Sequence, residues 1–204
     1  MSNIVSKPEK YFRQFVPDRD SLLIELEAEA QHEEIPIVGP VVGELLFILA
    51  RTSRAKRILE LGTATGYSAI YLARACEIFK GKVVTLENDG DMAARARQNI
   101  QKAGLKDNVE IRVGDALAEI AKSDEIFDFI FMDIEKEDYI RALPDCQRLL
   151  KRGGLLAADN VGFKDADEFN QSISSNPEWR PVSLFAYLPF HSPENDGLCI
   201  ALRQ

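Results

Sequence analysis

The sequence has 204 residues and a formal net charge of −8, with 46% hydrophobic and 28% charged residues. This composition is ordinary for a globular protein, and the length suits one domain with a sizeable core, so we expect a single domain over residues 1–204. The negative charge argues against a large contact with nucleic-acid phosphates, although it leaves room for a local basic patch.

Targeting and redox signals in the sequence are weak. Apolar runs fall short of the roughly 18 residues of a membrane helix, and residues 1–8 lack the apolar segment of a secretory signal. Cys76, Cys146 and Cys199 are widely separated and odd in number, which is typical of reduced, buried thiols. We therefore expect a cytoplasmic protein that makes no membrane contact.

The first 34 residues predict an arm followed by a helix. Residues 1–19 are polar and carry two prolines, so we expect a short arm that packs on the body or on a partner. From residue 20 to residue 34, apolar side chains recur at helical spacing between acidic ones, which predicts an amphipathic helix. A second helix is expected over 40–52, because Pro40 suits a first helical turn.

The rest of the chain alternates between strand-like and helix-like patterns. Strands are expected at 57–61, 82–87, 109–113, 127–132 and 153–158, and helices at 67–78, 89–103, 115–122 and 135–149. This alternation is typical of right-handed βαβ units, and it predicts an α/β protein with a doubly wound, mostly parallel sheet.

The C-terminal part predicts a helix near 165–175 and then a hairpin. Two apolar stretches, 181–188 and 197–203, are separated by a segment that ends in Asn195-Asp196-Gly197. We expect the two stretches to pair as antiparallel strands at the sheet edge, with Asn195-Asp196-Gly197 in the turn.

One glycine-rich stretch joins the first strand to the helix that follows it. Residues 57–68 read RILELGTATGYS, with Gly62 and Gly66 four residues apart. Glycine allows a positive φ and lets a ligand approach the backbone closely. The first amides of the next helix are then free to bind a polar ligand group. Such a turn also occurs for purely structural reasons, so the assignment depends on the strand ends that follow.

Acidic residues stand at the next two strand ends. Glu87 ends the second predicted strand, where an acid commonly accepts hydrogen bonds from ribose hydroxyls. A surface charge or a helix cap is the structural alternative for Glu87. Asp115 follows the third strand and can cap the next helix, accept from an adenine amino group, or do both. Together these features predict an adenosine-containing ligand across three strand ends.

The turn sequence narrows the choice of ligand. A dinucleotide site carries G-x-G-x-x-G, whose middle glycine admits the pyrophosphate, and Ala64 stands at that position here. The sequence also lacks a P-loop lysine. The E-x-G-x-x-x-G pattern that begins at Glu60 is typical of proteins that bind S-adenosylmethionine. This adenosine ligand has no phosphate, and its amino acid end can contact the loop.

The fourth and fifth predicted strands end in oxygen-bearing side chains. Asp133 follows the fourth strand and Asp159-Asn160 follows the fifth. Neighbouring strands lie about 4.8 Å apart, so three oxygen ligands could converge on one ion. Hard oxygen donors favour Mg²⁺, Mn²⁺ or Ca²⁺ over zinc. Acidic strand ends are often only helix caps, which is the structural alternative.

These motifs together resemble the cation-dependent O-methyltransferases, the family of catechol and caffeoyl-coenzyme A O-methyltransferases. The resemblance covers roughly residues 35–203. The residues that carry it are Val38-Gly39, the stretch from Glu60 to Ser68, Glu87, Asp115-Ala116, Asp133-Ile134-Glu135-Lys136, Asp159-Asn160 and Asp196-Gly197. The first turn is generic among methyltransferases, whereas the D-x-x-K and D-N motifs are more specific.

The resemblance implies a Rossmann-like, seven-stranded sheet with an antiparallel last strand, and commonly a homodimer. The candidate contacts of S-adenosylmethionine are Val38, Glu60, Gly62, Ala64, Ser68, Glu87, Asp115, Ala116 and Asp133. Asp133, Asp159 and Asn160 would hold a divalent cation, with Mg²⁺ as the first expectation and Mn²⁺ or Ca²⁺ as alternatives. Lys136, beside Asp133, would be the catalytic base, and a salt bridge to Glu135 or Asp138 is its structural alternative.

The implied chemistry suits these residues. A phenol near pKa 10 is largely protonated at neutral pH, and the neutral hydroxyl is a poor nucleophile. A divalent cation bound to both oxygens of a vicinal diol favours the anion, and Lys136 can take the proton if its own pKa is lowered. The resemblance thus implies methyl transfer, by direct displacement, to a hydroxyl of a small catechol-like or hydroxycinnamoyl-type substrate.

Two other functions remain open at this point. Some bacterial relatives methylate a hydroxylated uridine in transfer RNA, and Lys7, Arg13 and Arg19 of the arm could supply local contacts despite the net charge. A non-catalytic protein that binds S-adenosylmethionine is the other alternative, disfavoured by the intact metal set and by Lys136.

The aromatic residues near the C-terminus are ambiguous. Phe163, Tyr187, Phe190 and His191 would either line a pocket for a flat aromatic ring or serve as loop and core residues. Trp179 is expected to be a packing anchor.

Overall fold

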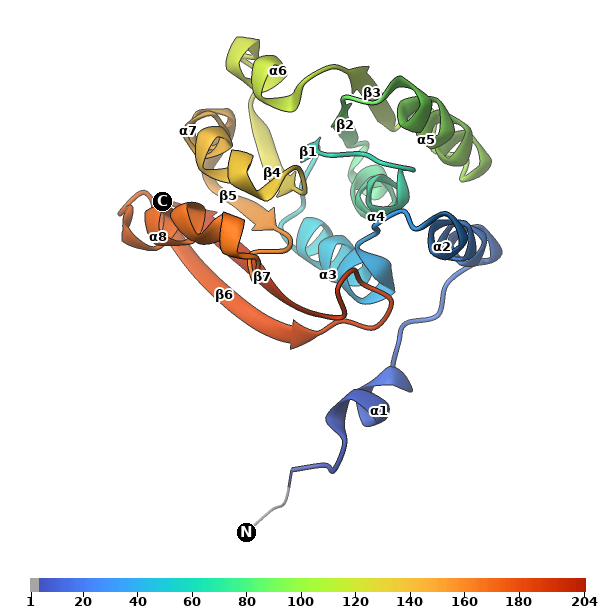
Figure 1. Ribbon diagram of the computed structural model, residues 1–204. Coiled ribbons are helices and arrows are strands. Elements are labelled where there is room, and N and C mark those ends of the chain that lie inside the picture. The colour runs from blue at the N-terminus through green and yellow to red at the C-terminus, as the bar shows by residue number, and fades with distance from the viewer. Residues whose placement is uncertain (1–3) are drawn as a thin grey trace.

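The computed structural model describes residues 4–204, so the expectations for residues 1–3 lie outside the described residues. Seven strands form one mixed sheet in this range, with helices on both faces (Figure 1). The strands are β1 (Arg57–Leu61), β2 (Lys82–Glu87), β3 (Val109–Val113), β4 (Phe127–Met132), β5 (Leu150–Ala158), β6 (Trp179–Tyr187) and β7 (Asn195–Arg203).

The helices cover the sheet in two layers. The α-helices are α1 (Pro8–Arg13), α2 (Ser21–Glu33), α3 (Gly39–Thr52), α4 (Tyr67–Cys76), α5 (Gly90–Lys102), α6 (Ala116–Lys122), α7 (Tyr139–Leu149) and α8 (Asp167–Ser175). Short 3₁₀ turns are η1 (Glu77–Phe79), η2 (Lys136–Asp138) and η3 (Lys164–Ala166). Among residues 4–204, every helix is too short or too polar to cross a membrane.

The strand order is β3-β2-β1-β4-β5-β7-β6. Strands β3, β2, β1, β4 and β5 pair in parallel, and β7 runs antiparallel to both β5 and β6. The predicted doubly wound, mostly parallel sheet with an antiparallel last strand is confirmed. The chain leaves β1 toward β2 and later returns to β4 on the other side. This reversal between β1 and β4 is the place where open α/β sheets bind ligands.

The predicted strands at 57–61, 82–87, 109–113 and 127–132 have the predicted bounds. The fifth strand begins earlier than expected, at Leu150, because Leu150 also pairs with β4, beyond an irregular stretch that contains Gly153 with a φ of +76°. Leu150 pairs with Phe127, and a register shift separates this pair from the regular pairing that begins at Phe129. Glycine tolerates this positive φ. The hydrophobic pattern alone does not predict that the strand extends to Leu150.

The hairpin is confirmed, but the prediction of its turn is wrong. Asn195, Asp196 and Gly197 lie inside β7, where they pair with Tyr187, Ala186 and Phe185, and residues 188–194 form the connection. Asp196 is buried because its carboxylate accepts hydrogen bonds from the backbone amides of Gly162 and Gly197. These contacts hold the Asn-Asp-Gly segment against the body of the protein.

The N-terminal arm contains a helix that the sequence patterns did not predict. Helix α1 begins at Pro8 and lies apart from the sheet in Figure 1. The Arg13 guanidinium forms a 2.5 Å ion pair with Glu194 and lies 5.6 Å from the ring centroids of both Tyr187 and Phe190. The arm therefore contacts the β6–β7 connection (residues 188–194).

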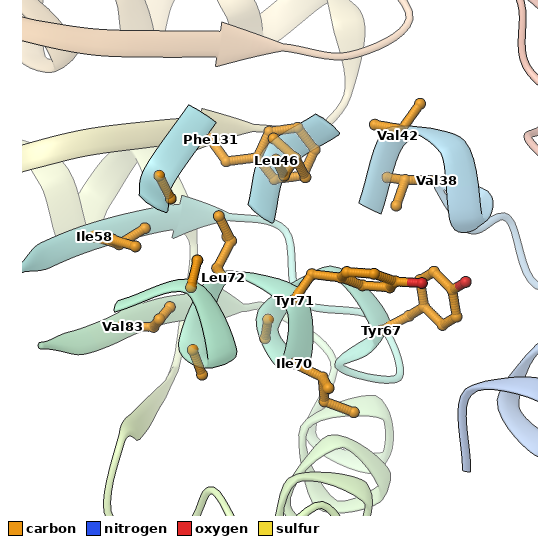
Figure 2. Close-up of a cluster of buried hydrophobic side chains, with 14 of the residues drawn as sticks. Val38, Val42, Leu46, Ile58, Tyr67, Ile70, Tyr71, Leu72, Val83 and Phe131 are labelled. Carbon is orange, nitrogen blue, oxygen red and sulfur yellow. The ribbon is translucent and has the colours of Figure 1, made fainter. Parts of the chain in front are cut away.

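Alternating side chains of the strands divide the core between the two faces of the sheet. Ile58 points into a cluster with Leu46 of α3 and Leu72 of α4, shown in Figure 2. Leu59, the next residue of β1, packs in a second cluster with Leu143 of α7. This two-sided burial is typical of a parallel sheet covered by helices on both faces.

Helix α3 allows a direct test of this packing. Leu46 is 1% exposed, whereas Ile48 of the same helix is 51% exposed. We expect Leu46→Ala to lower the free energy of unfolding by about 2–5 kcal/mol, because it removes buried methyl groups and leaves a cavity. Ile48→Ala is the matched control, with an expected change of about 0.5 kcal/mol. Urea unfolding followed by circular dichroism measures both, and equal losses would contradict the assigned orientation of α3.

Candidate active site

A cavity of about 770 Å³ opens at the carboxyl ends of β1, β2, β4 and β5. This volume lies within the range of small-molecule and cofactor sites. Of the predicted cofactor, metal and catalytic residues, those that line it are Val38, Gly62, Ala64, Ser68, Glu87, Asp115, Ala116, Asp133, Lys136, Asp159 and Asn160. Glu60 is fully buried near the end of β1.

The loop after β1 has the backbone that the two glycines predicted. Gly62 and Gly66 have φ values of +96° and +86°. A Cβ on Gly62 would lie 2.0 Å from the carbonyl oxygen of Asp133, so any side chain there would collide with the end of β4. Gly62 therefore brings the loop after β1 against the loop after β4, which places Asp133 beside the predicted cofactor loop.

Glu87 holds this loop in place. One of its carboxylate oxygens accepts hydrogen bonds from the amides of Thr63 (3.2 Å) and Ala64 (2.7 Å), and the other accepts from the amide of Asp89 (2.9 Å). Ala64 has a φ of +45°, which is uncommon for a residue with a Cβ. The hydrogen bond from the Ala64 amide to the Glu87 carboxylate stabilises that conformation. Glu87 is thus neither a surface charge nor the cap of the next helix, since Asp89 caps α5.

Asp115 caps the helix that follows β3. Its side chain accepts a hydrogen bond from the amide of Ala118 at 2.7 Å, as expected for an N-cap. Asp115 also lines the cavity together with Ala116. The capping use is confirmed, and it leaves a second carboxylate oxygen available to a ligand.

Glu60 is the most unusual group near the cavity. It is fully buried, and neither carboxylate oxygen has a hydrogen-bond partner among the described residues. Burial raises the pKa of Glu60 to about 7, a rise that the hydroxyls of Thr85 and Ser68 oppose and the charges of Asp133 and Glu87 increase. A buried carboxylate without a partner is costly unless a ligand completes it. The ammonium group of an amino acid ligand is a suitable partner, so the residues fit S-adenosylmethionine.

The ends of β4 and β5 are held side by side. The amide of Asp133 donates to the carbonyl of Leu61 at 2.8 Å, and the amide of Asp159 donates to the carbonyl of Met132 at 3.0 Å. The hydroxyl of buried Tyr139 lies 3.1 Å from the Met132 carbonyl oxygen and 3.0 Å from that of Asp159. Sequence patterns missed Tyr139, whose hydroxyl ties together the two strand ends that carry the predicted metal ligands.

Asn160 is oriented by two acceptors. Its side-chain nitrogen donates hydrogen bonds to the carbonyl of Ser192 and to the carboxylate of Asp196. The side-chain oxygen of Asn160 is thereby left available as a ligand for a cation. Asn160 adopts a φ of +50°, a left-handed conformation that asparagine tolerates better than most residues. Asp196 is therefore a positioning residue, which the sequence interpretation had placed in a turn.

The candidate ligands of a hard cation include the side-chain oxygen of Asn160 as well as carboxylate oxygens. No three His, Cys, Asp or Glu side chains within residues 4–204 form a metal-binding group by themselves. The oxygens of Asp133 and Asp159 therefore need the amide oxygen of Asn160 as a third donor, and all three side chains line the same cavity. Carboxylate and amide oxygens are typical ligands of Mg²⁺, Mn²⁺ and Ca²⁺.

His191 contacts the same edge from the β6–β7 connection. Its Nε2 lies 3.0 and 2.9 Å from the two carboxylate oxygens of Asp159, and its Nδ1 lies 2.6 Å from the carbonyl oxygen of Pro193. Burial lowers the pKa of His191, but the hydrogen bond to Asp159 and the charge of Asp159 outweigh burial and raise the pKa. His191 and Phe163 both line the cavity.

Lys136 pairs with Asp133, the aspartate of the D-x-x-K motif. Its Nζ lies 2.9 Å from Asp133 Oδ1 and 2.9 Å from the carbonyl oxygen of Ile134. The predicted alternative, a salt bridge to Glu135 or Asp138, is wrong, and Asp138 pairs with Arg141 instead. Lys136 therefore stands at the cavity wall, next to a candidate metal ligand.

Some of the C-terminal aromatic residues line the cavity, and others are loop or core residues. Tyr187 and Phe190 face Arg13 of the arm, and Phe190 is 45% exposed. Phe163 is 44% exposed at the cavity. Trp179 is 3% exposed within the core, as expected of a packing anchor.

Comparison with known proteins agrees with this geometry. Residues 16–172 match the model of a family described as O-methyltransferase. The chain is 43% identical to a catechol O-methyltransferase of Niastella koreensis over 128 residues, 61% of this chain and 58% of that protein. It is 39% identical to a catechol O-methyltransferase of Mycobacterium tuberculosis over 137 residues, 66% of this chain and 62% of that protein. The alignments thus span about three fifths of these two relatives.

A solved structure extends the similarity to nearly the whole chain. The O-methyltransferase from Bacillus cereus, determined in complex with SAH, superposes with a TM-score of 0.84 at 30% identity and with 97% of both chains covered. The family match includes most of the chain and the cavity-forming strand ends β1, β2, β4 and β5. The protein therefore belongs to the O-methyltransferase family.

The unpartnered Glu60 leads to a prediction about pH. The Glu60 pKa is raised from 4.5 to about 7 in the folded protein, so the folded state binds more protons than the unfolded state between these values. The free energy of unfolding should therefore fall as pH rises from about 4.5 to 7, by roughly 3 kcal/mol from this group. Urea unfolding at pH 5 and pH 8 without ligand measures the change.

The matched variants isolate the contribution of Glu60. Glu60→Gln should remove this part of the pH dependence, whatever its effect on absolute stability. Glu168→Gln, at an exposed position of α8, should leave the pH dependence unchanged. An identical pH profile for wild type and Glu60→Gln would show that the carboxylate is satisfied or solvated in the apo protein.

Proposed function

We propose that the protein is an S-adenosylmethionine-dependent, divalent-metal-dependent O-methyltransferase that acts on a hydroxyl of a small catechol-like or hydroxycinnamoyl-type substrate. The observation that carries the proposal is the composition of one cavity edge. There Asp133 with Lys136, and Asp159 with Asn160, follow neighbouring parallel strands. Unpartnered Glu60 precedes Leu61, whose carbonyl accepts a hydrogen bond from the Asp133 amide.

The cofactor side of the cavity is formed by the ends of β1, β2 and β3. Bound S-adenosylmethionine would supply a methyl group on a positively charged sulfur. Glu60 would pair with its ammonium group, and the loop from Gly62 to Gly66 would accommodate its amino acid end. Glu87 and Asp115 would accept hydrogen bonds from the ribose and the adenine, through lone pairs that their backbone contacts do not use. The structure of the Bacillus cereus relative in complex with SAH supports this use of the fold.

The acceptor side is formed by the ends of β4 and β5. Asp133, Asp159 and Asn160 would hold the divalent cation, which favours the ionised form of an acceptor hydroxyl. Lys136 would take the hydroxyl proton at Nζ. Lys136 Nζ lies 2.9 Å from Asp133 Oδ1, so the proposed base stands directly beside a proposed metal ligand.

The substrate class rests on the cavity and on the named relatives. The cavity of about 770 Å³ has room for a cofactor and a small acceptor, and Phe163 would offer an exposed aromatic surface to the acceptor. The two curated relatives are named catechol O-methyltransferase. A transfer RNA acceptor is less well supported because the carboxylates of Glu87, Asp115, Asp133 and Asp159 line the cavity and would repel phosphates.

We also propose a cytoplasmic homodimer. Exposed aromatic side chains on α1, just after α1 and on the edge strand β6 support this assembly, since Phe12, Phe15 and Phe185 are 53%, 59% and 77% exposed. Large apolar side chains that gather on a surface commonly mark a protein interface.

A substrate panel tests the reaction itself. The purified protein is incubated with S-adenosylmethionine and a catechol, a hydroxycinnamoyl thioester or unmodified and hydroxylated transfer RNA, each with Mg²⁺ or with EDTA. We expect methylation of a small vicinal diol that stops with EDTA and returns with excess Mg²⁺. Methylation that persists in EDTA would refute metal dependence, and methylation of the RNA alone would replace the proposed substrate class.

Asp159→Ala separates the metal side from the cofactor side. We expect it to abolish metal-dependent turnover, because it removes a central oxygen donor, while the affinity for S-adenosylmethionine stays within about threefold. Calorimetric titration with S-adenosylmethionine and a methyl-transfer assay measure the two effects. Asp165→Ala, an exposed position on η3, serves as the control. Wild-type turnover of Asp159→Ala would remove Asp159 from the metal site.

Lys136→Met tests the proposed base. We expect kcat to fall about 10²–10⁴-fold, because a general base contributes an effect of this size, with little change in cofactor affinity. Lys122→Met, at an exposed position in α6, should keep wild-type kcat. Steady-state kinetics at saturating substrate give the comparison, and an unchanged kcat would leave Lys136 as a structural partner of Asp133.

A further inference from the structure

Helix α2 leads directly into the wall of the cavity. At the C-terminal end of this helix Glu34 has a φ of +57°, and the amide of Ile35 donates a hydrogen bond to the carbonyl of Ala30 at 2.9 Å. This left-handed cap ends the helix and directs the chain into residues 35–38. All four of these residues line the cavity. The position of α2 therefore affects the shape of the cavity.

Glu27 is a largely buried carboxylate of α2, with a side chain that is 9% exposed. It accepts a hydrogen bond from the hydroxyl of Tyr67 at 2.7 Å. The guanidinium of Arg19, just before the helix, donates from Nε to both carboxylate oxygens at 3.0 and 3.2 Å, and from a second nitrogen at 3.0 Å. Charge-assisted hydrogen bonds of this forked kind are strong and directional. Glu27 is therefore held in a defined position relative to Tyr67.

Tyr67 connects this carboxylate to the loop from Gly62 to Gly66. It is the first residue of α4 and directly follows Gly66. Tyr67 is 2% exposed and lines the cavity. It belongs to the same buried cluster as Val38, another residue of the cavity lining, and Figure 2 shows both side chains. Burial and the hydrogen bond to Glu27 raise the pKa of the Tyr67 hydroxyl, so the hydroxyl remains a donor.

Arg19 restrains Glu27 independently of Tyr67. Its remaining nitrogen donates a hydrogen bond to the carbonyl of Pro17 at 3.1 Å. The guanidinium carbon lies 5.6 Å from the ring centroid of Phe190, in the β6–β7 connection. A guanidinium over an aromatic ring is attracted to the face of that ring. The contacts of Arg19 thus join α2 to the arm and to the connection, and they fix the carboxylate that Tyr67 contacts.

We propose that Glu27 is a positioning residue of the cofactor site. Through its hydrogen bond to Tyr67, it holds the cavity wall that follows Gly66 in the conformation that binds S-adenosylmethionine. The proposal rests on the cofactor use proposed above. Glu27 is not one of the described residues that line this cavity, so it acts through Tyr67 and not by touching the cofactor.

Calorimetric titration of the full chain with S-adenosylmethionine tests this role. Tyr67→Phe removes only the hydroxyl, and Glu27→Ala removes its acceptor. We expect each variant to raise the Kd about 5–30-fold, which is part of the effect of losing a hydrogen bond to a charged group. The double variant should raise the Kd no further than Glu27→Ala alone, because both changes remove the same hydrogen bond.

Glu33 provides a matched control on the same helix. Its carboxylate pairs with Arg95 of α5 at 2.6 Å, and the two side chains are 45% and 31% exposed. An exposed ion pair of this kind contributes little, so Glu33→Ala should keep the Kd for S-adenosylmethionine within about twofold of the wild type. A loss in Glu27→Ala without a loss in Glu33→Ala assigns the effect to the buried contact and not to α2 in general.

Steady-state kinetics with catechol as the acceptor give a readout that a merely structural role would not move. We expect the KM for S-adenosylmethionine to rise in Tyr67→Phe and Glu27→Ala, while kcat at saturating cofactor stays within about threefold. Partial unfolding would instead lower kcat and the calorimetric stoichiometry and leave KM and Kd unchanged. If Glu27→Ala does not fold, or if catechol is not methylated, the Kd of Tyr67→Phe decides the question.

The outcomes separate this proposal from the proposed function. An unchanged Kd in either single variant would overturn the positioning role of Glu27 and leave the proposed function intact. Additive losses in the double variant would also overturn it, because the two side chains would then act independently. Failure of the wild type to bind S-adenosylmethionine would overturn the proposed function, and the role of Glu27 with it.

Discussion

Backbone hydrogen bonds between the ends of β1, β4 and β5 are the constraint on which the candidate site depends. Asp133 is tied to the end of β1 through Leu61, and Asp159 is tied to the end of β4 through Met132. Because these strands are parallel, the residues that follow them emerge at one edge of the sheet. Tyr139 strengthens this edge, since its hydroxyl contacts carbonyls of both β4 and β5. The positions of the functional side chains thus follow from the register of the sheet.

The edge gathers buried negative charge, and each carboxylate is compensated differently. Glu87 accepts three backbone amides, and Asp159 faces His191 and the amide of Asn160. Glu60 has no such partner among the described residues. Burial of a carboxylate without a hydrogen-bond partner is costly, and a cationic ligand would relieve that cost. The same charges that disfavour the empty site would therefore favour the proposed positively charged cofactor and the proposed cation.

The sequence could predict the parts of the fold that depend on local patterns. Four strands have the predicted bounds, and most predicted helices agree within two residues, although α7 begins at Tyr139 and not at residue 135. Because parallel strands end at one edge of a sheet, all but one of the candidate site residues line one cavity. Partners distant in the sequence were not predictable in this way. Asp196 is buried against Gly162, 34 residues away, and this contact overrides the turn tendency of Asn-Asp-Gly. Helix α1 was missed because six residues give too short a period to recognise.

The β6–β7 connection shows where prediction from strand patterns ends. No periodicity describes residues 188–194, yet they contact two parts of the candidate site and the N-terminal arm. Glu194 holds Arg13 of the arm, His191 faces Asp159, and Ser192 binds Asn160. Phe190 packs on Gly39, next to Val38 on the cofactor side of the cavity. The acceptor side is therefore shaped by one loop whose position depends on α3, on the arm and on the end of β5 together, so a change in any of these elements alters the surroundings of the proposed cation.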